Sequence, residues 1–576
     1  MKKTLLFLLA ASASVVSATA EIKTPELIND ASIHIVSANG RYAVSELYGT
    51  LKIFDLVEGT SVAYEPDEDW VEYYTLGNGN GMTHDGSILV ASTKSSMDAA
   101  YLENGEWHQL DVPDPNMTNI SNGITPDGSR ICGSIGLNPM TLESKIMQVP
   151  VYWDRKADGS GYGECQPLPY PTTDLFGEVP QYVTALYISD DGKTIAGQMV
   201  FNSGMMTIPV IYYQDAEGEW SYDLPTKDLF NPEGIEAVEN PGDGPEPPFY
   251  EDFMTPEELE AYHDALNGYE YGSGDPYPEF TDFITPEEKA EYDAAMEAYQ
   301  ALQGEWYSKY VAFADYRDEV IATSPNFQQN NCFLSTDGKF MVSTLVTDDP
   351  NADPMGWGPA PQLNTPATVN LETGALVKID TELSLTVSGV ANNGVILAHN
   401  GMSSNPTLGY VIKDGDVQTL TDYLGAISPE FVEWIDENMT HEVVVDIDWD
   451  TWEEIWEELT YTGIPAATPD LRVITIWNTS PWDDWEGAQS VVFHTSGLTG
   501  ISTVGAGVKN IKAVANGVIA VPEGFSALDV FDVNGRCIKS VGAPNGEISL
   551  KAAPGVYVAK GTRADGTISV VKIVCN

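Results

Sequence analysis

One short motif recurs along most of the chain and limits the possible folds more than any other feature of the sequence. An apolar residue is followed by about two small or polar residues, then Asp-Gly or Asn-Gly, then an apolar-rich run. Copies begin at Val36, Met82, Ile124, Ile188, Leu334, Val390 and Ala467. The last copy has Asp470 but lacks the glycine. These dipeptides favour type I′ hairpins, in which both central residues have positive φ, and the motif therefore predicts seven hairpins.

Each copy is followed by a second segment in which apolar and polar residues alternate around a turn, as in a half-exposed hairpin. Two hairpins make a four-stranded antiparallel sheet, and seven such sheets arranged radially make a β-propeller. The shortest spacing, between Gly86 and Gly128, matches the about 40–45 residues of one propeller blade. The alternative is a sandwich of unrelated hairpins, which would not repeat one inner-strand motif. We therefore expect an all-β chain built around a seven-bladed β-propeller.

The repeat, with its Asp-Gly-Lys turns at Asp191 and Asp337, also resembles the inner hairpins of TolB-like and WD-type propellers. That resemblance implies a fold and no activity.

The longest gap between copies contains two helix-start signals. Thr255-Pro-Glu-Glu and Thr285-Pro-Glu-Glu each combine a Thr N-cap, Pro at the first helical position and the Glu of a capping box. The second helix either continues through Tyr307 to Tyr316 or breaks at Gly304. We expect residues 236–323 to form a helical insertion, either a functional lid or partner arm or a solvated decoration.

Residues 1–20 have the pattern of a secretory signal peptide. Lys2 and Lys3 precede a short apolar run, and Ala18-Thr19-Ala20 offers small residues for cleavage. The alternative is an ordinary buried helix. No later stretch reaches about 18 apolar residues, so we expect no membrane-spanning segment in the mature chain. The sequence therefore predicts export.

The charge balance excludes two classes of partner. Acidic residues outnumber basic ones 86 to 27, for a net charge of −59. Removal of Lys2 and Lys3 with the signal peptide would make it −61 (−59 − 2). Nucleic acids and anionic membranes need clustered Lys and Arg, so neither is an expected partner. Hydrophobic residues make up 43% of the chain, which is enough for a buried core.

Residues 501–576 have a different pattern, with short alternating strands and Asn-Gly or Asp-Gly turns. This pattern predicts a small antiparallel Ig-like β-sandwich. The segment resembles the type A sorting domain of the type IX secretion system, found in Bacteroidetes. The matching stretches are Val530-Phe-Asp-Val-Asn-Gly-Arg, Pro554-Gly-Val-Tyr-Val and Val571-Lys-Ile-Val. The family's Pro-Asn-Pro element is replaced by Val521-Pro-Glu-Gly. The alternative is a plain adhesive module.

The resemblance implies that this segment addresses the protein to the type IX secretion machinery. The protein would then be secreted or displayed at the cell surface, via the periplasm, with the domain often removed. The residues carried over as the sorting motif are Asp532, Gly535, Arg536, Gly555, Tyr557 and Lys572.

Motifs of known catalytic chemistry are missing from the sequence. The chain has no sialidase Asp box, no Gly-x-Ser-x-Gly, no HExxH, no P-loop and no Gly-x-Gly-x-x-Gly after a strand. The cysteines form no CxxC pair. Cys537 and Cys575 could form a disulfide, or both could be free thiols packed as small hydrophobes. We therefore expect no catalytic residues and no metal site.

Two segments could carry a ligand. Asp446, Asp448, Asp450 and Glu457 have the spacing of EF-hand calcium ligands, but Thr451 replaces the glycine that the loop needs. The competing interpretation is a strand through Val443 and then a short helix with Trp452, Ile455, Trp456 and Leu459 on one face. Calcium is therefore a possible cofactor, and otherwise we expect none.

Seven of the 13 Trp residues lie between Trp434 and Trp485. Aromatic rings beside carboxylates could form a sugar-binding platform, or they could pack in the core.

We expect a signal peptide (1–20), a propeller in two parts (21–235 and 324–500), the insertion at 236–323 and the sorting sandwich at 501–576. The function that we expect is a non-catalytic binding or scaffold protein that presents blade loops to an unknown glycan or protein ligand. The alternative is a propeller-fold glycoside hydrolase, or another polysaccharide-acting enzyme, with two close carboxyl groups near the axis.

Overall fold

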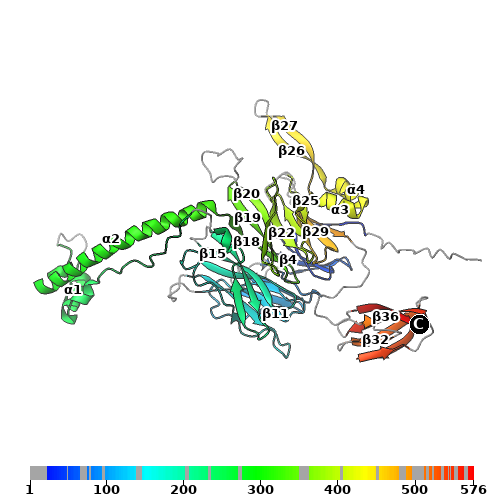
Figure 1. The fold of residues 1–576 in the computed structure, drawn as a ribbon, viewed down its shortest axis with the longest axis horizontal. Helices are drawn as coiled ribbons and strands as arrows, with labels where there is room; N and C mark the ends of the chain where they lie inside the picture. The colour runs from blue at the N-terminus through cyan, green and yellow to red at the C-terminus, as the bar shows by residue number, and fades with distance from the viewer. Residues whose placement is uncertain are drawn as a thin grey trace, which may run out of the picture. The chain divides into compact units, whose positions relative to one another are not determined.

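The chain is mainly β-structure, arranged as antiparallel sheets (Figure 1). The computed structural model describes residues 23–47, 50–64, 74–76, 80–93, 98–137, 146–201, 206–230, 235–269, 276–348, 362–401, 406–448, 453–478, 488–495, 512–513, 518–521, 525–532, 537–542, 544, 546–550, 555–563 and 568–575. The predicted signal peptide (1–20) lies outside these residues. Two compact units are distinguished, one with 1–170, 181–225 and 326–576, and one with 171–180 and 226–325.

Seven four-stranded modules contain most of the described strands of the first unit. Module 1 consists of β2 (Ile33–Val36), β3 (Tyr42–Leu47), β4 (Thr50–Asp55) and β5 (Thr60–Tyr64). Module 2 consists of β6 (Tyr74–Leu76), β7 (Ile88–Thr93), β8 (Asp98–Glu103) and β9 (Glu106–Gln109). Module 3 consists of β10 (Ile120–Ile124), β11 (Arg130–Gly136), β12 (Gln148–Asp154) and β13 (Gln166–Pro167).

Module 4 consists of β14 (Tyr182–Ile188), β15 (Thr194–Phe201), β16 (Met206–Gln214) and β17 (Trp220–Asp223). Module 5 consists of β18 (Asn326–Leu334), β19 (Phe340–Asp348), β20 (Gln362–Asn370) and β21 (Ala375–Lys378). Module 6 consists of β22 (Thr386–Val390), β23 (Ile396–His399), β24 (Gly409–Lys413) and β25 (Asp416–Thr419). Within each of the first six modules the strands pair in chain order. A single parallel bridge, Gln148 to Tyr182, joins modules 3 and 4.

The seventh module combines strands from distant parts of the sequence. It contains β28 (Ile464–Ala467), β29 (Val473–Asn478) and β30 (Gln489–His494), and its outer strand is β1 (Glu26–Asn29). β1 pairs antiparallel with β30 from Glu26–Val492 to Asn29–Gln489. The beginning of the described chain therefore completes the last module.

The predicted inner hairpins are confirmed in all seven modules, but the predicted turn type is wrong. A type I′ turn needs positive φ at two residues, whereas only the glycine position has it here, as at Gly128 with φ of 71°. The backbone N–H of Gly128 donates to the carbonyl of Thr125. The turns are therefore type I turns followed by one left-handed residue.

Side chains explain this choice of turn. The Thr125 hydroxyl donates to Asp127 Oδ1 at 2.8 Å, and Asp127 Oδ1 also accepts the backbone N–H of Ser129 at 2.9 Å. Six of the seven turns have such a Ser or Thr at this first position. The repeated Asp or Asn is thus a turn-forming residue, because its side-chain oxygen binds the local donors.

Buried clusters join neighbouring modules face to face. Val44 and Leu51 of module 1 pack with Leu89 and Leu102 of module 2. Similar clusters join modules 4 and 5, 5 and 6, and 6 and 7. One further cluster combines Ile33 and other residues of module 1 with residues of module 7, so the first and last modules share a core.

The second unit is helical. It contains η1 (Lys227–Phe230), η2 (Tyr250–Phe253), α1 (Pro256–Gly268), η3 (Phe280–Asp282) and α2 (Pro286–Thr323), the long helix labelled in Figure 1. Both predicted capping boxes are present, at Thr255 and Thr285. Of the two alternatives for the second helix, the structure has the continuous one, because α2 runs through Gly304.

The two helix starts of this unit pack as a duplicated pair. Tyr250 and Phe280 occupy equivalent positions in the two copies and stack on each other, with ring centroids 5.4 Å apart. Phe253 contacts Tyr292, and in the reciprocal contact Phe283 meets Tyr262. The duplicated sequence therefore has its own small aromatic core.

One predicted helix is wrong. The segment expected to be helical around Trp456 is β27 (Glu453–Thr460), which pairs antiparallel with β26 (Thr440–Asp448). Two helices absent from the prediction, α3 (Leu420–Ile427) and α4 (Pro429–Asn438), precede this hairpin. They pack through Leu424 and Phe431 against the core of modules 6 and 7.

The C-terminal segment contains two antiparallel sheets. One has β31 (Lys512–Ala513), β32 (Val518–Val521) and β35 (Gly546–Ser549), and the other has β34 (Cys537–Gly542), β33 (Phe525–Asp532), β36 (Gly555–Arg563) and β37 (Ile568–Cys575). Ile519 and Val521 of the first sheet share a buried cluster with Leu528 and Ile573 of the second.

The Cys537 thiol is free. Its strand β34 and the strand of Cys575, β37, lie at opposite edges of one sheet, which keeps the two residues apart.

Among the described helices, none combines the length and the apolar character that crossing a bilayer requires.

Candidate functional site

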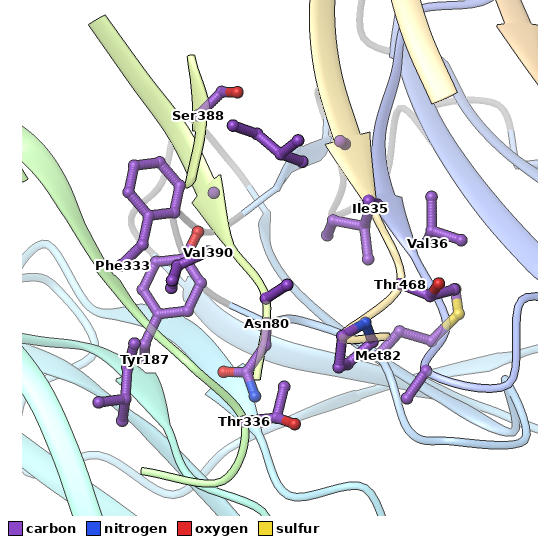
Figure 2. A pocket seen from close by; sticks show the side chains of 18 of the residues that line it. Ile35, Val36, Asn80, Met82, Tyr187, Phe333, Thr336, Ser388, Val390 and Thr468 are labelled. Atoms are coloured by element: carbon purple, nitrogen blue, oxygen red, sulfur yellow. The ribbon is translucent and has the colours of Figure 1, made fainter. Parts of the chain in front are cut away.

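The inner strands and turns of all seven modules line one cavity of about 130 Å³. Each module contributes at least one lining residue, for example Ile35, Met82, Ile124, Tyr187, Phe333, Val390 and Ala467. Figure 2 shows Tyr187 and Phe333 on one side of this cavity and Ile35 on the other. The seven copies of the repeat thus converge on one place, which we call the axial cavity.

Asn80 is the main uncharged polar group in the axial cavity. Its side-chain Nδ2 donates to the carbonyl of Ile188 at 2.8 Å, and its Oδ1 accepts the backbone N–H of Ile188 at 3.1 Å. The carbonyl of Asn80 accepts the backbone N–H of Ile124. Through its side chain and its backbone carbonyl, Asn80 of module 2 therefore bonds to the inner strands of modules 4 and 3.

Tyr187 and Phe333 form an aromatic wall between modules 4 and 5, with ring centroids 5.2 Å apart. Burial in the surrounding protein raises the pKa of the Tyr187 phenol above its ordinary value. Tyr187 is therefore neutral at physiological pH.

Asp190 is the one acidic residue among the described residues that line the axial cavity. The Thr336 hydroxyl donates to Asp190 Oδ2 at 3.2 Å, and the backbone N–H of Asp190 donates to the carbonyl of Thr336 at 2.6 Å. Asp190 Oδ1 is buried and has no hydrogen-bond partner within the described chain. The pKa of Asp190 is raised to about 6: burial is the largest cause, the nearby Asp337 and Asp191 also raise it, and the Thr336 hydrogen bond opposes them.

His34 lines the cavity from β2. Its ring meets Trp477 edge-on at 5.0 Å, and its Nε2 lies 3.2 Å from the Ser32 hydroxyl. Desolvation by the surrounding protein lowers the pKa of His34. The His34 ring packs as part of the cavity wall.

The dimensions and the charges limit the chemistry of this cavity. Pockets for drug-sized ligands are larger, at about 300–1,000 Å³. Glycoside hydrolysis needs two carboxyl groups flanking the bond. Asp190 is the one carboxyl among the described lining residues, and its neighbours Asp191 and Asp337 do not line the cavity.

The described sorting-motif residues lie on neighbouring strands of one sheet. Asp532 of β33 pairs with Tyr557 of β36, and Lys572 of β37 pairs with Val558. Tyr557 is buried in the cluster shared by the two C-terminal sheets. Gly555 begins β36, while Gly535 and Arg536 lie outside the described residues.

The segment proposed as an EF-hand does not have EF-hand geometry. Asp446 and Glu457 lie on the paired strands β26 and β27, whereas an EF-hand loop leads into a helix. Residues 449–452 lie outside the described residues. No cluster of three or more potential metal ligands occurs in the described part of the chain.

The described Trp residues of the Trp-rich segment lie in different parts of the structure. Trp434 packs edge-on against Phe493 in the core of modules 6 and 7, and Trp477 contacts His34. Trp456 is exposed on β27. Trp449, Trp452, Trp482 and Trp485 lie outside the described residues. The three described rings therefore do not form one platform.

Sequence reasoning missed Asn80 and Asp190, the two polar residues central to the axial cavity. Asp190 lies directly before the Asp191-Gly192 pair. That pair indicates a turn, and it gives no sign that the residue before it faces a cavity. Asn80 has no local signal, because its partners lie 44 and 108 residues further along the chain.

No protein-family model and no curated protein matches the chain. Solved structures match over most of its length at low identity. One is oligogalacturonate lyase from Vibrio parahaemolyticus, with 10% identity, 83% of this chain and 98% of that chain covered, and a TM-score of 0.38. Another is Kuenenia stuttgartiensis hydrazine synthase (10%, 80% and 94%, TM-score 0.36). A third is the β-propeller domain of the Trilobed protease from Pyrococcus furiosus (8%, 69% and 83%, TM-score 0.30).

Proposed function

We propose that the seven modules close into a seven-bladed β-propeller. Three observations support this arrangement: all seven inner hairpins line one cavity, modules 1 and 7 share a buried cluster, and β1 pairs with β30. A ring of sheets accounts for all three at once, since in a ring the first and last modules become neighbours. The C-terminal sheets around Leu528 would form a separate Ig-like sandwich.

We propose that the protein is a non-catalytic binding or scaffold protein. The observation that carries this proposal is the axial cavity, which is small and whose described lining includes one acidic residue, Asp190. With little room for chemistry at the axis, the loops and the helical unit are the larger surfaces available to a ligand. The ligand would be a glycan or a protein.

We propose that the protein works outside the cell. The signal-peptide pattern of residues 1–20 and the sorting-domain resemblance of residues 501–576 support export through the type IX secretion machinery. The test is deletion of residues 501–576 in the native host. We expect the truncated protein to be retained in the periplasm, and its normal secretion would contradict the proposal.

Binding is tested with the full-length protein on an array of glycans and peptides, with calcium and then with a chelator. A specific hit without turnover of the ligand supports a recognition role. Turnover of a bound polysaccharide would instead support the hydrolase alternative.

A further inference from the structure

One side of the long helix α2 is packed within its own helical unit. Trp306 stacks on Tyr310, with ring centroids 5.0 Å apart, and its Nε1 donates to the carbonyl of Gly242 at 2.9 Å. Phe313 follows Trp306 by two helical turns, so it lies on the same side, and it is buried. This side of α2 therefore already has its partner, within residues 226–325.

Another side of α2 is exposed. It carries residues spaced three and four apart in the sequence, which lie on one face of a helix. They are Glu297, Gln300, Gly304, Tyr307, Val311, Ala314 and Asp318, and we call these seven residues the exposed row. Ala314 is half-buried and the other six are exposed, with exposed fractions of 60% for Tyr307 and 39% for Val311.

The exposed row has the spacing of a coiled-coil seam. Alternating steps of three and four residues place its members at the a and d positions of successive heptads. Tyr307, Val311 and Ala314 make an apolar middle, and Gly304 beside them has no side chain to keep another backbone away. A narrow seam of this kind packs against one other helix, and most of the stability of helices in proteins comes from such packing.

The charge of α2 restricts which helix can pack there. The helix contains nine acidic and three basic residues. All three basic residues already face carboxylates: Lys289 meets Asp293 at 2.6 Å, Lys309 meets Glu305 at 2.9 Å, and Arg317 meets Glu178 at 3.3 Å and Asp318 at 3.4 Å. The surplus on α2 is therefore negative, and residues 226–325 as a whole carry 25 acidic and 4 basic residues.

The exposed row itself is acidic at both ends, at Glu297 and Asp318. A second copy of the chain would bring these carboxylates together, either each on its own copy or Glu297 on Asp318. Like charges placed opposite each other oppose association, whereas opposite charges favour it and select the partner. The row therefore suits a partner helix with Lys or Arg at both ends and an apolar middle.

We propose that the exposed row of α2 docks a basic helix of a partner protein. The proposal rests on the proposed function, from whose two ligand classes it selects the protein. Tyr307 and Val311 would supply the apolar contact at the centre of the interface, and Glu297 and Asp318 would set which helix is accepted.

The test uses the full-length protein and the fluorescence anisotropy of a labelled helical peptide of three heptads. The basic peptide has Leu at its middle a and d positions and Lys towards both ends, and its acidic twin has Glu in place of each Lys. The key variant combines Tyr307→Ala with Val311→Ala, because alanine keeps the helix and removes the apolar middle. The matched control is Leu302→Ala, since Leu302 is equally exposed on α2, at 58%, but lies outside the exposed row.

We expect saturable binding of the basic peptide and much weaker binding of the acidic twin. The Tyr307→Ala and Val311→Ala pair should raise the Kd by about 10-fold or more, as the truncation of central interface residues does. Leu302→Ala should leave the Kd unchanged. Glu297→Gln with Asp318→Asn should also weaken binding at low salt, and this effect should shrink at about 0.5 M NaCl, where the charges are screened.

Three results would overturn the assignment: no saturable binding of the basic peptide, equal binding of the acidic twin, or a Kd that the Tyr307→Ala and Val311→Ala pair leaves unchanged. The last result would show that the acidic chain attracts the peptide without using the exposed row. A glycan or another protein bound on the array in any of these cases leaves the proposed function standing and removes this docking site alone.

Discussion

Leu471 occupies the position that glycine holds in the other six inner turns, with a φ of 59°. A left-handed conformation costs a non-glycine residue about 1–2 kcal/mol. Leu471 is 5% exposed and packs with Ile474 and Phe493 in the core of modules 6 and 7. Removal of a buried leucine side chain costs about 2–5 kcal/mol, which exceeds the strain.

We therefore expect Leu471→Gly to destabilise the protein by about 1–3 kcal/mol in urea unfolding, although glycine is the consensus of the repeat. A Leu471→Gly variant as stable as the wild type would show that strain, and not burial, dominates this turn.

Gly128→Ala should also destabilise the protein in urea unfolding, by about 1 kcal/mol, because the added Cβ would meet Ile88 at 3.0 Å and the φ of Gly128 is positive.

Asp190 predicts a pH dependence of stability. Its folded pKa of about 6 lies above the ordinary carboxyl value of 3.8, so the folded state holds the proton more tightly than the unfolded state. The stabilisation from this proton is complete below about pH 3.8 and is lost as the pH rises through 6. At pH 7 the ionised carboxyl costs roughly 3 kcal/mol at most.

Asp190→Asn should therefore be more stable than the wild type at pH 7, by about 1–3 kcal/mol, and the difference should shrink towards pH 4. Unfolding in denaturant at several pH values measures this. Asp127→Asn is the control of opposite sign. Burial raises the pKa of Asp127, but hydrogen bonds from Ser129 and Thr125 outweigh burial and leave it lowered. An equal difference for Asp190→Asn at both ends of the range would contradict the buried carboxyl.

At the scale of elements, the sequence predicted those features that depend on residues close together in the chain. Thr255 and Thr285 form the expected capping boxes because each box lies within four residues. The segment around Trp456 was predicted as a helix from its i, i+3, i+4, i+7 spacing, but Glu453–Thr460 also fits a strand. Pairing with Thr440–Asp448 decides between them, and pairing is not a local property. The short helix α3 was missed although Thr419 caps it.

Gly304 gives a prediction for α2. It lies in the interior of the helix, and a Cβ added there would have no atom within 4 Å outside the helix's own backbone. Gly304→Ala should therefore stabilise α2 by about 0.5–1 kcal/mol and slow its amide hydrogen exchange. Ser308→Ala, one turn further on, is the comparison for a change that removes a side-chain hydrogen bond at the same place, because the Ser308 hydroxyl donates to the carbonyl of Gly304 at 3.0 Å. Faster exchange in Gly304→Ala would show that α2 bends or breaks at this position.

At the scale of the whole molecule, the sequence predicted the seven hairpins but not the residues that meet at their centre. The hairpins follow from local turn chemistry at residues such as Asp127 and Gly128. The roles of Asn80 and Asp190 depend on which distant modules become neighbours, as shown by the bonds from Asn80 to Ile188 and from Thr336 to Asp190. The β1–β30 pairing is equally non-local, so no window of sequence contains it.

Closure of the ring by β1 and β30 is tested most directly by a disulfide across that pair. Asn29 and Gln489 are partners in the ladder, and Gln489 Nε2 donates to Asn29 Oδ1 at 3.2 Å. Such partners have Cα atoms about 4.5–5.5 Å apart, within the range of a disulfide. We predict that Asn29→Cys with Gln489→Cys oxidises to one intramolecular disulfide and raises the melting temperature, whereas Asn29→Cys with Gln109→Cys does not. Two thiols that both stay reactive in the folded Asn29→Cys/Gln489→Cys protein would contradict a closed seven-bladed propeller.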